Sequence, residues 1–472
     1  LAAFRILAES SGKERAALLE AMASRIEGRA NSLVSRVGIE TALPEARVRA
    51  ELGRTAGQLR MFAALVRDGS WVDARIDHAD PSRQPLPKPD VRSMLRPLGP
   101  VAVFCAGNFP LAFSVAGGDT AAALAAGNPV VAIAHPGHPG TAELVARSIA
   151  EAVAATGSPE GTFSLLQGPG EVVGIELVRD PRLAAVGFTG SRTAGMAIAR
   201  EAAARPVPIP VFAEMSSVNP VVILPDALRE RGAEIADALV GSVLLGVGQF
   251  CTNPGLILVP GDADAFVDRL TQLFASSPIG TMLRDDTCRR YREALSMRAA
   301  AAGVRTLART DPPEGTAQAG AALFEVEAAN LLARPALASE IFGPAATVVR
   351  WRSLDELHRV LGSLEGQLTA TIHGNPEEIR DSDLIWRLQR LAGRVLIGGV
   401  PTGVEVGPAM VHGGPYPATS DGRSSSVGTR AITRFTRPVC FQNVPDALLP
   451  PELKEANPLS LWRLVDGSWG RA

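Results

Sequence analysis

The sequence predicts an α/β protein built around parallel sheets, and two observations lead to this fold class. Between residues 98 and 224, short apolar runs alternate with alanine-rich segments whose apolar positions have helical spacing. Parallel strands buried on both faces are continuously apolar, and each needs a crossover helix to reach the next strand. A second region of this kind runs from residue 225 to about 400. Because 472 residues are too many for one core, we expect two or three domains.

The elements can be assigned in chain order from these patterns. Helices are predicted at 14–29 and 45–67, followed at 74–96 by a segment with four prolines among charges, which we expect to form an exposed arm. The strands predicted next are 101–105, 129–134, 163–166, 184–188 and 211–213. The helices between them are 115–126, 141–156 and 193–204, and later helices are 264–275 and 354–361. A last strand is expected at 437–442.

Charge and composition exclude several classes of function. A formal net charge of -2 gives no electrostatic attraction to nucleic acid or to an anionic membrane. Residues 101–118 carry no charge, but the Gly-Asn-Phe-Pro break at 107–110 argues against a membrane helix. Widely spaced cysteines and histidines without a ligand pattern predict no disulfide framework and no metal site. No signal peptide is visible, so we expect a cytoplasmic protein.

One cysteine stands in a loop that suits chemistry. Cys251 lies in the run Gly-Gln-Phe-Cys-Thr-Asn-Pro-Gly at 248–255, directly after a small and apolar segment. A reactive thiolate needs access and a favourable charge environment, which a loop offers more easily than a packed core does. By itself this segment leaves two interpretations open, a nucleophile and a buried structural cysteine.

Polar side chains near strand ends are further candidates, because α/β proteins build their sites at the carboxyl ends of parallel strands. The Asn108 amide could donate to an oxyanion or simply hold its own turn. Glu214 could be a general base with a raised pKa, or a strand-end carboxylate in solvent. Glu340 precedes a Gly-Pro turn, where a solvated cap is the commoner use of a carboxylate.

Two glycine-rich turns suit a dinucleotide. Gly168 follows the predicted strand 163–166, and Gly190 and Ser191 follow strand 184–188, with Gly195 in the first turns of the next helix. Small residues let backbone N–H groups approach a pyrophosphate, and a helix N-terminus favours its charge. Neither turn is the GxGxxG fingerprint, so each alone is weak evidence.

Taken together, these segments resemble the aldehyde dehydrogenase superfamily. The motifs, in that family's order, are Asn108-Phe109-Pro110, Phe188-Thr189-Gly190-Ser191 with Gly195, Glu214-Met215, Gly248-Gln249-Phe250-Cys251 and Glu340-Ile341-Phe342-Gly343-Pro344. Longer matches at 117–120, 135–141, 213–220, 399–406, 412–420 and 437–440 are similar to the α-ketoglutaric semialdehyde (2,5-dioxovalerate) dehydrogenase branch, which also contains bacterial fatty aldehyde dehydrogenases.

The resemblance implies the domain organisation. It implies a Rossmann-type cofactor domain over 1–73 and 97–224 and an α/β catalytic domain over 225–410. A small β oligomerisation arm would be formed by 74–96 and 436–472, in a homodimer or homotetramer.

The resemblance also implies the roles of the site residues. Cys251 would attack an aldehyde, Asn108 and the Cys251 N–H would hold the oxyanion, and Glu214 would activate water against the thioester. This scheme gives the thiol no histidine partner, so its loop and the cofactor charge are expected to lower its pKa. Glu340 would hold the nicotinamide ribose and Ser191 the pyrophosphate. Further expected cofactor contacts are Gly168, Gly190, Gly195, Phe342, Ile133 and Pro110, and Phe109 is an expected substrate contact. A dicarboxylic semialdehyde would need a cation near its channel, for which Arg423 is a candidate; an ordinary surface loop arginine is the alternative.

One departure from the family concerns the adenosine end of the cofactor. Ile133 stands where the family has a lysine for the ribose or its 2′-phosphate, and Pro136 stands where many NAD-preferring relatives have glutamate. We expect NADP or NAD, with NADP favoured by the branch and weakened by Ile133. His135 and His138 are the nearby replacements, expected to gain charge near pH 6.

Three functional hypotheses follow from these residues. The first is NAD(P)-dependent, hydrolytic oxidation of a small-molecule aldehyde, either α-ketoglutaric or a related semialdehyde, or a medium- to long-chain fatty aldehyde. The second is acyl transfer, against which the water-activating Glu214 argues. The third is a cofactor-impaired, non-catalytic paralogue, suggested only by Ile133.

Overall fold

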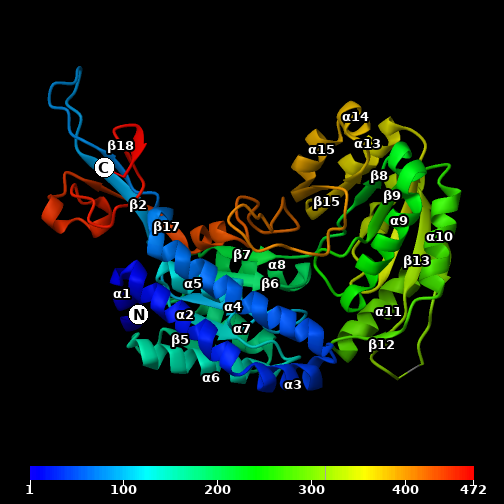
Figure 1. Ribbon diagram of the computed structural model, residues 1–472, viewed down its shortest axis with the longest axis horizontal. Helices are drawn as coiled ribbons and strands as arrows, with labels where there is room; N and C mark the ends of the chain where they lie inside the picture. The colour runs from blue at the N-terminus through cyan, green and yellow to red at the C-terminus, as the bar shows by residue number, and fades with distance from the viewer. Residues whose placement is uncertain (314, 472) are drawn as a thin grey trace.

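The computed structural model describes residues 1–313 and 315–471. In this part of the chain, most strands belong to three sheets, two of five strands and one of seven, and one further pair is formed by β10 (Gly280–Thr281) and β12 (Gln318–Ala319). Figure 1 shows the three sheets along the long axis of the molecule, with the five-stranded sheet whose first strand begins at Val101 in the middle. The expected α/β fold class is confirmed.

The central sheet is parallel throughout and has the order β5–β4–β3–β6–β7. Its strands are β3 (Val101–Phe104), β4 (Val130–Ile133), β5 (Phe163–Leu166), β6 (Ala185–Thr189) and β7 (Val211–Glu214). The helices between them are α5 (Gly118–Ala126), α6 (Pro139–Thr156), α7 (Gly170–Arg179) and α8 (Arg192–Ala203). All five strands lie within one residue of their predicted positions, because each is a buried apolar run bounded by turn residues.

The N-terminal helices pack on this sheet's helices. They are α1 (Ala2–Glu9), α2 (Gly12–Gly28), α3 (Ala30–Thr41) and α4 (Glu45–Asp68). Helix α2 begins early because Ser11 and Glu14 form a capping box, in which each side chain bonds the other residue's backbone. Leu19, Met22, Leu59 and Phe62 are among the fully buried residues that join α2 and α4 to one core with the sheet.

One predicted helix starts later than expected. The segment predicted as helix 115–126 is helical only from Gly118, because residues 106–117 close on themselves in turns. Ala106 donates its N–H to the carbonyl of Phe113, and Gly118 donates to that of Ala112. The uncharged stretch is thus a strand, a turn and a helix. No helix within the described residues is long and apolar enough to cross a membrane.

The seven-stranded sheet has the order β11–β13–β14–β9–β8–β15–β16 and is parallel except for β11. Its strands are β8 (Val221–Ile223), β9 (Leu256–Pro260), β11 (Val304–Arg309), β13 (Ala322–Glu327), β14 (Ala345–Trp351), β15 (Gln367–His373) and β16 (Ala392–Ile397). Its helices are α9 (Pro225–Leu244), α10 (Asp264–Ala275), α11 (Asp285–Ala300), α12 (Ala328–Ala333), α13 (Leu354–Ser363), α14 (Pro376–Asp381) and α15 (Leu384–Leu391). Successive residues of β9 and β14 enter separate cores on the two faces. Strand β8 belongs to this sheet although it lies before the domain boundary expected at residue 224. The boundary itself stays a prediction.

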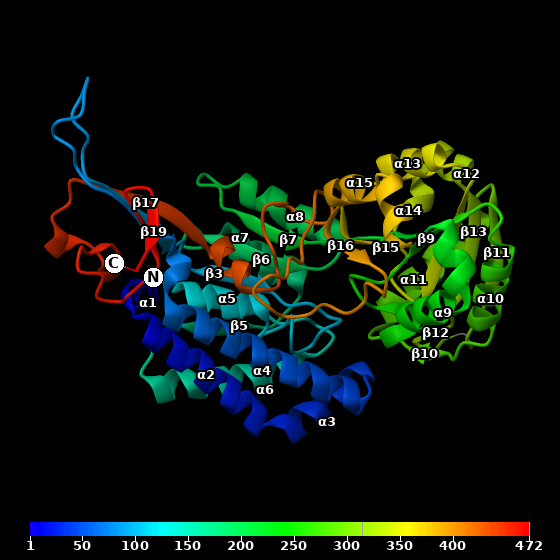
Figure 2. The ribbon, with the colours of Figure 1, turned by 45° about the horizontal axis from the view of Figure 1, so that its top comes forward.

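The third sheet joins the proline-rich arm to the C-terminal region, in the order β17–β2–β1–β18–β19. Its strands are β1 (Arg75–Asp77), β2 (Val91–Pro97), β17 (Thr436–Gln442), β18 (Arg463–Val465) and β19 (Ser468–Gly470). The predicted strand 437–442 finds its partner in the same chain, since Cys440 pairs opposite Ser93. The segment between β1 and β2 projects away from the molecule in Figures 1 and 2. Short 3-10 turns lie at Ser70–Val72, Leu245–Gly248, Pro335–Ala338, Thr429–Phe435, Asp446–Leu448 and Pro451–Leu453.

We expect this arm to carry an intermolecular contact in solution. Strands β17 and β19 lie at the two edges of the arm sheet, and Trp469 on β19 and Trp462 just before β18 expose 57% and 48% of their surface. Light scattering at micromolar protein should therefore give a dimer or a dimer of dimers. Trp469→Glu should shift the mass towards the monomer, whereas Trp386→Glu, on the equally exposed Trp386 of α15, should not. A monomeric mass for the unmodified chain would contradict the expectation.

Candidate functional site

The predicted site residues meet because two sheet edges face the same region. Asn108 follows β3, Ser191 follows β6 and Glu214 ends β7, so all lie at the carboxyl edge of the central sheet. Cys251 and Glu340 precede β9 and β14, which are parallel neighbours in the seven-stranded sheet. Their loops therefore share the amino edge of that sheet. The sequence predicted the site at the carboxyl edge of the central sheet, but not that the amino edge of the seven-stranded sheet would face it.

The Cys251 loop is held in a conformation that depends on glycine. Gly246, Val247 and Gly248 have φ values of 57°, 58° and 65°. A Cβ on Gly248 would lie 2.2 Å from the Gly343 carbonyl, so only glycine lets this loop pack on the Glu340 loop. The Asn219 amide then fixes the thiol's own backbone by donating to the Cys251 carbonyl at 2.8 Å. Together these contacts hold the thiol at the edge of the sheet.

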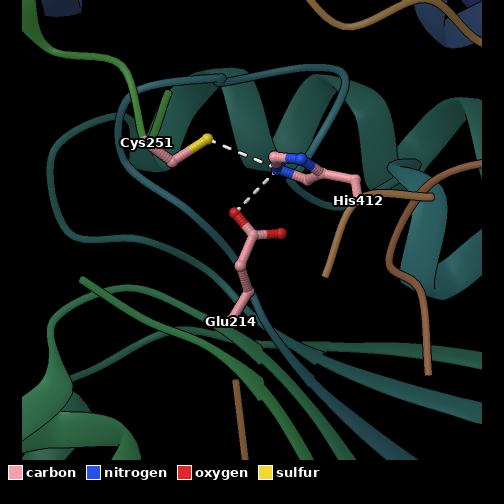
Figure 3. Close-up of side chains that lie close together, drawn as sticks. All are labelled: Glu214, Cys251 and His412. Carbon is pink, nitrogen blue, oxygen red and sulfur yellow. Dashed lines mark hydrogen bonds and ion pairs between the residues drawn. The ribbon is translucent and has the colours of Figure 1, made fainter. Parts of the chain in front are cut away.

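A histidine lies between the thiol and the carboxylate. His412 Nε2 is 3.5 Å from Cys251 Sγ and 3.0 Å from Glu214 Oε1 (Figure 3). The second carboxylate oxygen of Glu214 accepts a bond from the Ser426 hydroxyl at 2.5 Å. The expectation that the thiol has no histidine partner is therefore wrong, and His412 is a site residue that the sequence did not reveal. His412 begins the segment 412–420 that is similar to the semialdehyde dehydrogenase branch, but 161 residues separate it from Cys251, so no local pattern linked the two.

The C-terminal loops bring His412 to this position. Its N–H donates to Ser425 Oγ at 3.0 Å, and its carbonyl accepts from the Ser426 N–H at 2.8 Å. The same segment extends β7, because Glu214 forms a β-bridge with Thr419. The carboxylate and its two partners are thus tied to one another through backbone as well as side chains.

Glu214 is ionised more easily than the sequence suggested. Its side chain is buried, so it is not a strand-end carboxylate in solvent. Burial works to raise its pKa, but the charge of His412 and hydrogen bonds with His412 and Ser426 outweigh burial and lower that pKa. The expected raised pKa is wrong. A buried carboxylate that stays ionised at neutral pH is available as a general base.

The surroundings of Cys251 shift its pKa in the opposite direction, upward. Burial, the nearby Glu214 charge and a hydrogen bond with Glu214 raise the pKa of Cys251 well above its usual value, and the Glu340 charge adds to this. The cation of Arg54, on α4, acts in the lowering direction. The expectation that the loop lowers the thiol pKa is therefore not met in the protein by itself.

The Asn108-Phe109-Pro110 turn packs directly on the Cys251 loop. The Asn108 amide donates to the Gln249 carbonyl at 3.0 Å, two residues before the thiol. Phe109 stacks edge-on against Phe250 with ring centroids 5.3 Å apart, and Pro110 is buried. Asn108 is therefore at the site, while its donation to an oxyanion stays a prediction.

The two glycine-rich turns have the predicted strand–turn–helix form. Ser191 caps α8, its hydroxyl accepting from the Ala194 N–H at 3.3 Å, and it is exposed beside Gly190. A Cβ on Gly195 would lie 2.8 Å from Met215 Sδ, so this glycine lets α8 pack close to β7. Gly168 has a φ of 149° immediately before α7. Exposed N–H groups at two helix starts suit a pyrophosphate.

Glu340 is not a solvated cap. It lines one cavity together with Gly248, Phe250 and Phe342. Burial raises the pKa of Glu340 to about 7, although hydrogen bonds from the Ser216 hydroxyl and the Ser217 backbone act against the rise. A half-protonated carboxyl in a cavity next to the thiol can accept a hydrogen bond from a ribose hydroxyl.

The adenosine end of the expected cofactor site has no histidine cation. Ile133 ends β4 with 3% of its surface exposed. Burial lowers the pKa of His135 to about 3 and also lowers that of His138. The two rings stack with centroids 5.3 Å apart. The expectation of charge near pH 6 is therefore wrong for His135, whose pKa lies well below 6, and burial acts against it at His138.

Arg423 does not point to a substrate. Its side chain is 91% exposed and its guanidinium is paired with Asp421 at 2.9 Å. It fits the surface loop arginine that the sequence left as the alternative.

The central side chains also have the spacing of a metal site. The donor atoms of Glu214, Cys251 and His412 all lie within 4.8 Å of one another. Thiolate, imidazole and carboxylate are the ligand set that zinc accepts. The expectation that the protein uses no metal stays a prediction.

The fold and the site agree with comparisons to known proteins. Residues 1–414 match the family model described as the aldehyde dehydrogenase family. The chain belongs to the aldehyde dehydrogenase family. It is therefore an oxidoreductase that acts on small-molecule aldehydes, and the family uses NAD or NADP.

Two relatives and two solved structures show the range of similarity. Alpha-ketoglutaric semialdehyde dehydrogenase 2 of Azospirillum brasilense is 55% identical, covering 96% of this chain and 87% of the relative. Alpha-ketoglutaric semialdehyde dehydrogenase of Acinetobacter baylyi is 47% identical, covering 98% and 89%. A crystal structure of glyceraldehyde-3-phosphate dehydrogenase GapN from Methanocaldococcus jannaschii complexed with NADP has a TM-score of 0.77 at 22% identity, covering 93% and 91%. The structure of lactaldehyde dehydrogenase from Escherichia coli has a TM-score of 0.79 at 23% identity, and the match covers 93% of this chain and 88% of that one. Both structures show the fold alone.

The electrostatics of this aldehyde dehydrogenase predict how its thiol reacts. Because the Glu214 charge and hydrogen bond raise the pKa of Cys251, Glu214→Gln should lower that pKa. Alkylation by iodoacetamide, read by mass on the Cys251 peptide, should then reach half its maximal rate at a lower pH. Cys440, which is exposed on β17, serves as the internal control and should alkylate equally in both proteins. Slower alkylation in Glu214→Gln would show that the carboxylate takes the thiol proton instead.

Proposed function

We propose that this enzyme oxidises α-ketoglutaric semialdehyde, or a closely related semialdehyde, to the carboxylic acid through an acyl-cysteine. The observation that carries the proposal is the triangle of half-buried Cys251 with buried His412 and Glu214, which sets a nucleophile beside an ionised base. The substrate class is supported by the relatives with that printed name, at 55% and 47% identity over nearly the whole chain.

The nucleophilic step belongs to Cys251. After the thiol proton leaves to solvent, the sulfur attacks the aldehyde carbon, and donors at the Asn108 turn and the Cys251 N–H would hold the oxyanion that forms on the carbonyl oxygen. Asn108 already bonds the Gln249 carbonyl, so it is positioned by the same loop that carries the thiol. A nicotinamide bound beside the sulfur would accept the hydride and leave a thioester.

The hydrolytic step belongs to Glu214. Since His412 and Ser426 keep its carboxylate ionised and oriented, Glu214 can take a proton from water as the water attacks the thioester. An acid is released and the thiol returns. His412 is a positioning residue here, because it fixes the carboxylate oxygen nearest the sulfur.

The cofactor fits the residues that are present. The helix starts at Ser191 and after Gly168 suit the pyrophosphate, and Glu340, buried in a cavity with Phe342, suits the ribose of the nicotinamide. We infer NADP from the branch, held without a cation at Ile133 and without the carboxylate that would repel a 2′-phosphate. The cytoplasm remains the inferred location.

A medium- or long-chain fatty aldehyde is the second candidate. The rings of Phe109, Phe113 and Phe250 form a cluster next to the catalytic loop, which suits an apolar chain. A panel of semialdehydes and neutral aldehydes with NADP and NAD separates the two candidates by their kcat/KM values.

The two catalytic residues should have separable kinetic effects. Cys251→Ala should abolish oxidation, because no other residue is placed as the nucleophile. Glu214→Gln should keep hydride transfer and slow thioester hydrolysis, giving a burst of NAD(P)H absorbance followed by little turnover. Stopped-flow absorbance measures both phases. If burst and steady state fell equally in Glu214→Gln, the proposed role in hydrolysis would be wrong.

Cofactor affinity should depend on residue 133. A lysine near a 2′-phosphate makes a charge-assisted contact of ~1.5–3 kcal/mol, so Ile133→Lys should tighten NADP binding by roughly tenfold to a hundredfold. Ile133→Met, of similar length without charge, should not tighten it. NADP binding to the unmodified protein should be weak and should not tighten between pH 7 and pH 6, because burial keeps His135 neutral. Calorimetric titration measures all three, and equal affinity in Ile133→Lys would contradict the assignment of this strand.

A further inference from the structure

An arginine on α4 stands at the catalytic site with part of its guanidinium unused. The Arg54 guanidinium lies over the ring of Phe113 at 5.2 Å and over that of Phe109 at 5.8 Å. Its Nε and Nη2 are buried, and neither has a hydrogen-bond partner among the residues that the structure describes. Stacking on aromatic rings offsets only part of the free energy that it costs to bury a cation. Two buried N–H donors without hydrogen-bond partners therefore destabilise the protein by itself.

The position of Arg54 relative to the thiol follows from the rings. Phe113 lies under the guanidinium, and its centroid is 6.4 Å from that of the His412 ring. His412 Nε2 is in turn 3.5 Å from the Cys251 sulfur. The charges of Cys251 and Glu214 act on the pKa of Arg54 as well, which places the three groups within electrostatic reach of one another.

A second arginine on the same helix provides an internal comparison. Arg47, two turns earlier, lies over Phe109 at 4.5 Å and over Phe250 at 4.7 Å. Its Nη2 is 3.4 Å from Glu51, a buried carboxylate that also accepts the N–H groups of Leu111 and Ala112. Glu51 is hydrogen-bonded to Arg47, and its charge also acts on Arg54. Of the two arginines, Arg54 is the one with two buried donors that have no hydrogen-bond partner among the described residues.

We infer that Arg54 binds the carboxylate at the far end of the substrate from the aldehyde, seated against Phe109 and Phe113. The planar guanidinium offers its free Nε–H and Nη2–H as a fork, which matches the two oxygens of a carboxylate. The aromatic rings beneath it exclude water, which strengthens that pairing. The ligand class is therefore an aldehyde with a distal carboxylate, that is, a semialdehyde of a dicarboxylic acid.

This assignment rests on the proposed function and replaces Arg423, whose guanidinium is paired on the surface. It also explains how one cluster of rings can serve a charged substrate. The rings contact the short carbon chain of the substrate, and the cation above them takes its charged end. A fatty aldehyde would leave Arg54 without a partner, so the same residue disfavours that substrate.

The test compares carboxylate and neutral substrates of the same length. We would measure kcat/KM for α-ketoglutaric semialdehyde and for pentanal in the holoenzyme, in Arg54→Met and in Arg54→Lys. Loss of a charge-assisted contact should lower the ratio of the two kcat/KM values by about 10- to 100-fold in Arg54→Met, mainly through KM of the semialdehyde. Arg54→Lys keeps the charge but not the fork and should lie between.

A matched control lies on the same helix. Arg49 is exposed and bonds only surface groups, Glu45 and Asn31, among the described residues, so Arg49→Met should leave the ratio unchanged. Arg54 also lowers the pKa of Cys251, so a loss shared by both substrates in Arg54→Met reports the thiol and cancels in the ratio. Should Arg54→Met fail to fold, Arg54→Lys carries the test, and an unaltered ratio in Arg54→Lys would then overturn the assignment.

The outcomes separate this inference from the proposed function. An unmodified enzyme that oxidises pentanal better than the semialdehyde would overturn the proposed substrate and the role of Arg54 together. An unmodified enzyme that prefers the semialdehyde, with the preference intact in both Arg54 variants, would overturn the role of Arg54 alone. A preference that falls in Arg54→Met and not in Arg49→Met supports both.

Discussion

A buried carboxylate at the end of a parallel strand is the constraint on which the site depends. Glu214 lies out of solvent, and a buried charge is tolerated only with hydrogen-bonding partners. His412 and Ser426 supply them, and both come from the C-terminal loops. The chain must therefore return across β7 after the seven-stranded sheet is complete. The base, its orientation and its ionised state all follow from that return.

The same carboxylate sets the state of the nucleophile. Glu214 and Glu340 both place negative charge near Cys251, so the half-buried thiol resists ionisation in the protein by itself. A raised pKa lowers thiol reactivity, because the thiolate is the nucleophile. The cation of Arg54 acts against these charges by lowering the pKa of Cys251. In our proposal, it also binds the substrate carboxylate.

Close backbone packing holds the two halves of the site together. Gly248 packs so close to Gly343 that a Cβ on it would lie 2.2 Å from the Gly343 carbonyl, which joins the loop before β9 and the loop before β14 into one unit. Asn219 links that unit to the segment after β7 through the Cys251 carbonyl. Thiol, base and cavity for the ribose are therefore positioned by backbone contacts rather than by flexible side chains.

The sequence by itself determined the elements and the chemistry of single residues. Strands such as 163–166 and helices such as 264–275 were predictable because buried apolar runs and helical spacing are local signals, and Cys251, Glu214 and Asn108 stood out as polar residues at turns. Only the tertiary structure decided what surrounds them. His412 and Arg54 gave no local signal, since their roles come from contacts across the chain. The pKa values of Glu214, Cys251 and His135 were misjudged for the same reason: burial and partner charges shift them, and both are properties of the packed protein rather than of the sequence.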